Sequence, residues 1–257
     1  MQRFTDKVVI VTGGSSGLGA AAAVLMASQG AKVVIAARRR DKSEAVLARM
    51  AAAGGEGAFI QTDVTQAAQV EAMVAQTVER FGRLDCAVNN SGVTGATMTL
   101  LADVTEEAWD EVIDTNLKAV WMCMKHEIPA MLAGGGGAIV NVASLYGLIG
   151  SDLSHVGYSA SKHGVIGLTK TAAVDYGDKG VRVNAVCPGF DHSEMVDPYV
   201  EGAPDLMKAV VARHSAMNRL GESSEVAEAI AWLCSDAASF VNGAELAIDG
   251  GPTTRLY

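Results

Sequence analysis

Residues 7–19 read KVVIVTGGSSGLG, and this stretch is the clearest indication of the fold. Lys7–Thr12 is an apolar, β-branched run, which predicts a buried strand. Glycines follow it directly, and a helical pattern then extends to about residue 29. Glycines at this point permit a tight turn and a close backbone approach, and a helix N-terminus attracts phosphate. The spacing is G-x-x-x-G-x-G, and an ordinary turn is the alternative, but the position after the first strand favours a dinucleotide site.

Short apolar runs alternate with longer helical patterns along the rest of the chain. The predicted strands are Lys32–Ala37, Gly57–Gln61, Leu84–Val88, Ala138–Val142, Val181–Val186 and Glu245–Ile248. The predicted helices cover about 41–53, 66–80, 105–133, 156–178 and 223–235, and 190–220 is a loop-rich insertion. This alternation is typical of a parallel sheet covered on both faces. We therefore expect an α/β fold, a single doubly wound, Rossmann-like domain over residues 1–257 with helices on both faces.

The composition excludes several classes of partner. The 257 residues carry a formal net charge of −9, which argues against nucleic acid or an anionic membrane surface as a partner. No apolar stretch approaches the length of a membrane span, and charges precede any signal-like segment, so we expect no membrane association and a cytoplasmic location. The cysteines show neither C-x-x-C spacing nor a nearby His cluster, which predicts reduced thiols and no metal site. They are Cys86, Cys123, Cys187 and Cys234.

Three basic residues follow the second predicted strand. Arg38, Arg39 and Arg40 stand where an NAD site usually has an acid for the ribose 2′-hydroxyl, whereas an arginine accommodates the 2′-phosphate of NADP. The pattern favours NADP(H) over NAD(H), with a solvated basic turn as the alternative. Ser16 weakens the NADP interpretation, because a basic residue inside the glycine loop would have strengthened it.

Tyr158 and Lys162 form the first candidate for catalysis. Their spacing of four places both side chains on one face of a helix. A nearby cation favours the phenolate and lowers the pKa of a tyrosine toward neutral pH. Ser144, at the end of a predicted strand, could face Tyr158 across a substrate carbonyl. A short pair also occurs by chance, and a strand-end serine is often only a cap, so the combination of these residues carries the prediction.

With these motifs in this order, the chain resembles the classical short-chain dehydrogenase/reductase family over nearly its whole length. The matching elements are the T-G-x-x-x-G-x-G loop at Thr12–Gly19, Asp63-Val64, N-N-x-G at Asn89–Gly92, Asn116, Ser144, Tyr158-x-x-x-Lys162 and Pro188-Gly189. The resemblance implies an NAD(P)-dependent oxidoreductase that interconverts a secondary alcohol and a ketone. It also implies a homotetramer in which the helices at 105–133 and 156–178 pair between subunits, and chemistry that needs no metal.

The resemblance further implies a role for each catalytic residue. Tyr158 would be the general acid/base, and Lys162 would lower its pKa and bind the nicotinamide ribose. Ser144 would orient the substrate oxygen, and Asn116 would support a proton-relay water. The implied cofactor-binding residues are Gly13, Ser15, Ser16, Gly17, Leu18, Gly19, Arg38, Arg39, Asp63, Val64, Asn90, Tyr158, Lys162, Pro188, Gly189 and Ser193.

The chain departs from the family pattern mainly after Gly189. Asp191 and His192 stand where the family usually has an apolar residue. Either Asp191 points to solvent, or Asp191 or His192 recognises a polar group of the substrate. Ser193 stands where the family often has a threonine that binds the nicotinamide amide, and its hydroxyl can bind the amide in the same way.

Two further residues are substrate candidates. Tyr146 lies in an apolar run after Ser144 that is expected to form a pocket wall, which hints at a hydrophobic or partly cyclic substrate. His155, three residues before Tyr158, borders the pocket or lies on the surface at the start of a helix. The other histidines lack partners at metal spacing, and Trp109, Trp121 and Trp232 are expected in the core or at subunit contacts.

A non-catalytic nucleotide-binding or regulatory protein on the same fold is the alternative, because a fold does not fix a function. Such a protein would not need Tyr158, Lys162 and Ser144 together. The sequence leaves the substrate, the direction of the reaction and its stereochemistry open. Residues 190–220, which normally decide the substrate in this family, do not identify one.

Overall fold

The computed structural model describes residues 2–194 and 196–254, and in them one seven-stranded parallel sheet has the order β3-β2-β1-β4-β5-β6-β7. The strands are β1 Val8–Thr12, β2 Lys32–Ala37, β3 Glu56–Gln61, β4 Cys86–Asn89, β5 Gly137–Val142, β6 Val181–Pro188 and β7 Glu245–Ile248. The α-helices are α1 Gly17–Ser28, α2 Arg40–Ala52, α3 Ala67–Phe81, α4 Glu106–Ile113, α5 Ala119–Ala133, α6 Val156–Tyr176, α7 Asp197–Gly202, α8 Pro204–His214 and α9 Ser223–Cys234. The predicted fold class is confirmed.

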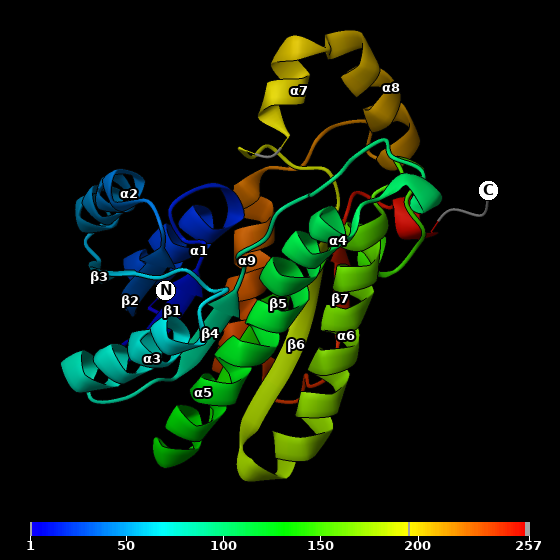
Figure 1. Ribbon diagram of the computed structural model, residues 1–257. Helices are drawn as coiled ribbons and strands as arrows, with labels where there is room; N and C mark the ends of the chain where they lie inside the picture. The colour runs from blue at the N-terminus through cyan, green and yellow to red at the C-terminus, as the bar shows by residue number, and fades with distance from the viewer. Residues whose placement is uncertain (1, 195, 255–257) are drawn as a thin grey trace.

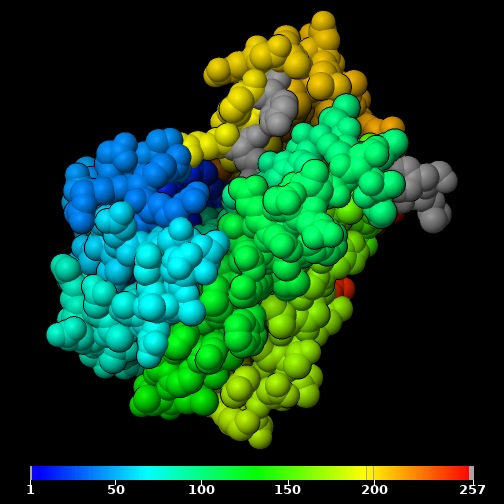
Figure 2. Space-filling view, viewed as in Figure 1, coloured from blue at the N-terminus to red at the C-terminus, as the bar shows by residue number. Residues whose placement is uncertain are grey.

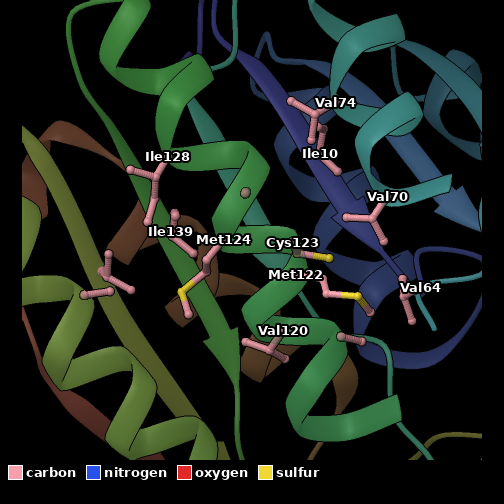
Figure 3. Packing of buried hydrophobic residues seen from close by; sticks show 14 of the residues in the cluster. Ile10, Val64, Val70, Val74, Val120, Met122, Cys123, Met124, Ile128 and Ile139 are labelled. Atoms are coloured by element: carbon pink, nitrogen blue, oxygen red, sulfur yellow. The ribbon is translucent and has the colours of Figure 1, made fainter. Parts of the chain in front are cut away.

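The inner strands β1, β2, β4, β5 and β6 are mainly apolar because the sheet is buried on both faces there, whereas the edge strands β3 and β7 are partly exposed. Along β1, Ile10 packs into the layer beneath α3, α5 and α6, whereas Val9 and Val11 pack into the layer beneath α1 and α9. Figure 1 shows these helices on opposite sides of the strands. In the first of the two layers, Val70 and Val74 of α3 approach Ile10 (Figure 3). The alternation of side chains along each strand thus supplies two apolar layers.

One predicted helix has a different internal structure. The stretch predicted as a helix over 105–133 consists of α4, a π-helical turn at Asp114–Lys118 and α5. A π turn inserts a residue into the α-helical repeat and turns the side chains near it, and such turns are frequent at functional sites. Asn116, a predicted catalytic residue, lies in the middle of this turn and is completely buried.

The insertion at 190–220 contains more helix than its sequence pattern predicts, namely α7 and α8. Both ends of the insertion are fastened together, because Gly221 N donates to Phe190 O at 2.9 Å and His192 N donates to Gly221 O at 2.9 Å. The helices stand above the carboxyl end of β6 (Figure 1) and form a lobe in the space-filling view (Figure 2). Ligands bind at the carboxyl edge of such sheets, so the lobe lies where a substrate would arrive.

None of the helices in the described part of the chain combines the length and the apolarity that a membrane crossing requires.

Candidate active site

The glycine loop after β1 adopts a backbone that other residues would strain. Gly13 and Gly17 have φ values of +65° and +50°, which lie in the left-handed region that favours glycine. At Gly19, a Cβ atom would lie 2.5 Å from Nδ2 of Asn90 and 2.6 Å from the carbonyl oxygen of Gly13. The loop therefore lies against the end of β4, with no room for side chains at Gly13 and Gly19.

Asn90 fastens the loop to β4. Its Nδ2 donates to the carbonyl oxygens of Thr12 and Gly13 at 3.1 and 3.3 Å, and its backbone N–H donates to Oγ1 of Thr12 at 3.0 Å. These bonds hold the loop in one geometry at the crevice between β1 and β4, which is the point where the strand order reverses.

The first turn of α1 is arranged for an anion. Ser16 is the N-cap residue, but no side chain accepts from the backbone N–H groups of the first turn, and this turn contains no acid. Uncapped N–H groups and the helix dipole together favour a phosphate. The absence of Cβ atoms at the glycines leaves the backbone open to close approach, so the loop fits the pyrophosphate of a dinucleotide.

Two cations next to the loop already hold an anionic group. Nη2 of Arg39 lies 2.9 Å from Oγ of Ser16 and 2.8 Å from Oε2 of Glu194, and Nζ of Lys42 bonds to the other oxygen of the same carboxylate. The bonds from Lys42 and Arg39 lower the pKa of Glu194 to about 2. The Glu194 carboxylate thus shows that the donors at this corner hold an anionic group. Ser15 lies 3.4 Å from the same guanidinium nitrogen.

The side chain of Arg38 interacts with a different residue from those that Arg39 contacts. Its charge acts on Asp63, whose Oδ1 accepts from the N–H and the hydroxyl of Thr65 at 3.0 and 2.8 Å. Asp63 and the buried Val64 follow β3 at the same edge of the sheet. The structure therefore places Arg39, and not Arg38, beside the glycine loop.

Lys162 and Tyr158 lie on one face of α6, as predicted from their spacing. Nζ of Lys162 donates to the carbonyl oxygen of Val142 at 2.7 Å and lies 5.5 Å from the centre of the Tyr158 ring. Lys162 is only 3% exposed, and burial lowers its pKa to about 8. Its ammonium group is thus fixed at the carboxyl end of β5.

Ser144 begins the short 3₁₀ turn that follows β5. Its Oγ accepts from the N–H of Tyr146 at 3.2 Å, which directs the hydroxyl toward α6. Burial raises the pKa of Tyr158, while a hydrogen bond with Ser144 lowers it and the charge of Asp191 raises it further. The expectation that Lys162 lowers the pKa of Tyr158 stays a prediction. The ammonium group of Lys162 is held by the carbonyl of Val142, 5.5 Å from the centre of the Tyr158 ring.

Asn116 ties the end of β4 to α6. Its Oδ1 accepts from the N–H of Val93 and its Nδ2 donates to the carbonyl of the same residue, both at 2.8 Å, and Nδ2 also donates to Oγ of Ser161 at 3.3 Å. A Cβ atom on Gly92 would lie 3.3 Å from Oδ1 of Asn116 and 3.7 Å from Nζ of Lys162. The structure brings Asn116 close to Lys162 without a direct hydrogen bond between them.

Asp191 is buried, so the alternative in which it points to solvent is wrong. It is 7% exposed, and its Oδ2 has no hydrogen-bond partner among the described residues. Burial raises its pKa to about 7. His192, by contrast, is exposed and pairs with Asp197 at 2.8 Å, so the structure does not bring its side chain to Tyr158.

The residues around Asp191 hold the loop after β6. Gly189 N donates to the carbonyl of Ile248 at 3.0 Å, and a Cβ atom at Gly189 would lie 2.7 Å from Cα of Asp249. Pro188 ends β6, and Ser193 donates from Oγ to the backbone oxygen of Asp191 at 3.3 Å. Pro188 at the end of β6 and the predicted residues Gly189, Asp191 and Ser193 after it thus lie at the same edge of the sheet as the glycine loop.

Tyr146 and His155 lie next to Tyr158, and two further aromatic residues join them. The His155 ring is 6.0 Å from the Tyr158 ring and 5.5 Å from the Tyr146 ring. Phe190 and His214 complete the group, at 6.2 and 6.3 Å from Tyr146. The sequence analysis missed both, because their positions near Tyr146 depend on the path of the insertion. Glu194 was missed for the same reason, and only a charge opposite to that of Arg39 could have pointed to it.

In the residues that the structure describes, no three His, Cys, Asp or Glu side chains come close enough to hold a metal ion.

Comparisons with known proteins agree with this geometry. The family model described as enoyl-(acyl carrier protein) reductase matches residues 13–253. A cyclohexanol dehydrogenase from Acinetobacter sp. strain SE19 is 40% identical over 98% of this chain and 97% of its own length. An A-factor type gamma-butyrolactone 1′-reductase (1S-forming) from Streptomyces virginiae is 44% identical over 97% and 96% of the two chains.

A solved structure shows the same fold. The crystal structure of levodione reductase superposes with a TM-score of 0.94 at 38% identity and covers 99% of this chain and 100% of its own. The sheet order, the glycine loop, the Ser144, Tyr158 and Lys162 arrangement and these relatives all point the same way. The chain belongs to the short-chain dehydrogenase/reductase family of oxidoreductases.

Proposed function

We propose that this protein is an NAD(P)-dependent oxidoreductase that interconverts a secondary alcohol and a ketone, with Tyr158 as the general acid/base. The observation that carries the proposal is the meeting of Ser144, Tyr158 and Lys162 at the carboxyl end of β5. A nucleotide-binding protein without catalysis would have no use for a buried lysine and a serine arranged around one phenol.

The bound nicotinamide supplies the hydride chemistry, and the chain supplies position and proton transfer. In ketone reduction, the Tyr158 hydroxyl donates its proton to the substrate oxygen, and Ser144 donates a hydrogen bond that holds this oxygen in place. In alcohol oxidation, the phenolate accepts the hydroxyl proton. Burial raises the pKa of Tyr158, so the phenol carries its proton at neutral pH, which is the form that ketone reduction uses.

Asn116 and Lys162 support this proton transfer by Tyr158. Lys162 keeps a positive charge near the phenolate below its pKa of about 8. Asn116 fixes Val93, and with it the segment that passes Lys162. We propose that this rigid junction, with a water molecule, relays the proton between Tyr158 and solvent.

The cofactor site is proposed to favour NADP(H). Arg39, Lys42 and Ser16 hold a carboxylate beside the glycine loop, and a 2′-phosphate would meet the same donors. No acid that could bind a ribose 2′-hydroxyl follows β2, where Arg38 to Arg40 stand instead. NAD(H) would lack the phosphate and gain little from these cations.

The proposed substrate is a compact cyclic secondary alcohol or its ketone. The relatives include a dehydrogenase named for cyclohexanol, which is such an alcohol, and the aligned length is nearly complete. The rings of Tyr146 and Phe190 pack together, and Tyr146 is joined to Tyr158 through His155; such rings offer apolar contact surfaces for a carbon ring.

We also propose a cytoplasmic homotetramer. Trp109 of α4 and Trp121 of α5 are 38% and 47% exposed, too much for core residues. Exposed tryptophans on adjacent helices are typical of an interface between subunits. The four cysteines are buried and free, as expected in a reducing compartment.

The experiment is a substrate panel followed by absorbance at 340 nm, with NAD(H) and NADP(H) tested separately. The proposal expects turnover of cyclic secondary alcohols or ketones and a higher kcat/KM with NADP(H). Absence of turnover with every alcohol and ketone, by protein that binds the cofactor, would contradict it.

A further inference from the structure

Four aromatic side chains beside Tyr158 form what we call the aromatic cluster: Tyr146, His155, Phe190 and His214. Tyr146 occupies its centre, and each of the other three rings lies edge-on to it, between 5.5 and 6.3 Å away. Phe190 and His214 also contact one another at 5.2 Å. Because His155 contacts Tyr158 as well, the cluster continues directly into the proposed site of reaction.

The carboxylate of Asp152 fixes two members of the cluster. It accepts from the hydroxyl of Tyr146 at 3.3 Å and lies 3.2 Å from Nε2 of His214, with Nε of Arg213 2.8 Å away. An ionised carboxylate only accepts hydrogen bonds, so Nε2 of His214 carries the proton. In the neutral ring the other nitrogen, Nδ1, is then a bare acceptor.

Among the buried polar atoms without a hydrogen-bond partner in the described part of the chain, two belong to the aromatic cluster and one to the residue after Phe190: Nδ1 of His214, Nδ1 of His155 and Oδ2 of Asp191. His214 is 3% exposed and Asp191 is 7% exposed. Asp191 follows Phe190 of the cluster directly, and its charge acts on Tyr158. Unpaired buried polar groups are destabilising, and native proteins keep few of them. Three on and beside one aromatic cluster indicate that the missing partner is a ligand.

The chemistry of these atoms defines that ligand. Nδ1 of the neutral His214 ring accepts, and so does Asp191 in its ionised form, so a ligand that presents a hydrogen-bond donor satisfies both. The rings of Tyr146 and Phe190, which pack against each other and against His155 and His214, place apolar carbon beside these atoms, which suits a compact carbon skeleton and not an extended charged chain. A hydroxyl group on such a skeleton satisfies both conditions.

We propose that His214, His155 and Asp191 form a subsite for a second hydroxyl group of the substrate, so that the enzyme acts on diols and hydroxyketones in preference to simple alcohols. This proposal rests on the proposed function. In the diol, the carbinol C–H bond breaks and its electron pair leaves as hydride to the oxidised nicotinamide. The O–H proton of the same carbon passes to the Tyr158 phenolate, and the C=O bond of a hydroxyketone forms. The second hydroxyl does not react.

The test compares one substrate pair in the wild type and in variants. The pair is cyclohexanol and cyclohexane-1,2-diol, with the cis isomer and both trans enantiomers assayed separately, and the quantity is the ratio of their kcat/KM values. The wild type is expected to prefer at least one diol isomer by about tenfold or more, the effect of one or two hydrogen bonds to buried acceptors.

The variants are His214→Phe and Asp191→Leu, which keep the shape of each side chain and remove its acceptors. Each is expected to reduce the diol-to-cyclohexanol ratio about fivefold to tenfold. Asp191→Leu is also expected to raise the melting temperature, because it removes an unpaired buried carboxyl. The matched control is His163→Phe on the exposed side of α6, where the histidine bonds to the carbonyl of Ser159, and it should leave the ratio unchanged.

The outcomes separate this inference from the proposed function. Turnover of cyclohexanol with no preference for any diol isomer would overturn the subsite and leave the function in place. A diol preference that survives both variants would overturn the assignment to these residues. Failure to oxidise any of the compounds, or to reduce their ketones, with either cofactor would instead contradict the proposed function itself.

Discussion

The guanidinium of Arg39 lies 2.8 Å from the carboxylate of Glu194, although the two residues are 155 positions apart in the chain. The contact joins the glycine loop to the insertion that stands over the site. It also places an acid of the chain where an anionic group of a cofactor would bind. The ion pair is about half exposed, so it contributes little to stability, and its effect should appear in ligand binding.

The first prediction concerns this contact. Glu194→Gln removes the competing charge and is expected to strengthen the binding of 2′,5′-ADP severalfold, because the 2′-phosphate then meets Arg39 and Lys42 without a rival. Arg39→Ala should weaken the same ligand about tenfold. Titration calorimetry measures both, with 5′-ADP as the control that lacks the phosphate. Equal changes for the two ligands would show that this corner does not bind the 2′-phosphate.

The second prediction concerns Asn116. Replacement by leucine leaves the N–H and the carbonyl of Val93 without their partners. The expected loss in the free energy of unfolding is about 1–3 kcal/mol, because two part-buried backbone groups lose their hydrogen-bond partner. Urea denaturation measures it. A loss below about 1 kcal/mol would mean that Asn116 does not tie β4 to α6 in solution.

The third prediction compares two glycines in helices. Gly19→Ala places a methyl group 2.5 Å from Asn90, and is expected to destabilise the protein by about 1–3 kcal/mol and to weaken cofactor binding. Gly167→Ala on α6 meets nothing within 4 Å, and is expected to stabilise by about 0.5–1 kcal/mol. Thermal unfolding and cofactor titration distinguish them. Equal effects would contradict the close contact of the loop with β4.

The fourth prediction is a pH dependence of stability. The pKa of Asp191 in the folded protein is raised from 3.8 to about 7 by burial, so between these values the folded state binds more protons than the unfolded state. The free energy of unfolding therefore falls as pH rises from about 4 to 7, by up to about 1.4 kcal/mol per pH unit from this group. Buried Glu127, with its pKa raised to about 7, adds to the slope.

Asp191→Asn isolates the contribution of Asp191. The difference in unfolding free energy between the variant and the wild type should grow in favour of the variant across this pH range, as chemical denaturation at several pH values would measure. Parallel curves for the two proteins would mean that Asp191 ionises in solution as an exposed carboxyl does.

The fold could be predicted from the sequence because its signals are local. The strand-forming runs, such as Lys7–Thr12, are mainly apolar, and each lies beside a helical pattern in the sequence. The predicted strand positions differ from the observed ones by at most two residues at either end. The π turn around Asn116 could not be predicted, because it depends on the contact of that side chain with Val93.

The site could be predicted only in part. Tyr158, Lys162 and Ser144 come together because a helix spacing and a strand end place them, whatever the rest of the chain does. Glu194 and His214 belong to an insertion whose path is set by tertiary contacts, such as the bonds between Phe190, His192 and Gly221. The burial of Asp191 depends on the same contacts, and its sequence position alone allowed two orientations.

The most direct test of the central claim is the turnover of Tyr158→Phe. The substitution removes one hydroxyl and keeps the ring that packs on His155. With the best substrate of the wild type, the account predicts a fall in kcat of at least about 10³-fold, while the dissociation constant of the cofactor changes less than about threefold. Turnover within tenfold of the wild type, by a variant that binds the cofactor normally, would contradict the role of Tyr158 as the general acid/base.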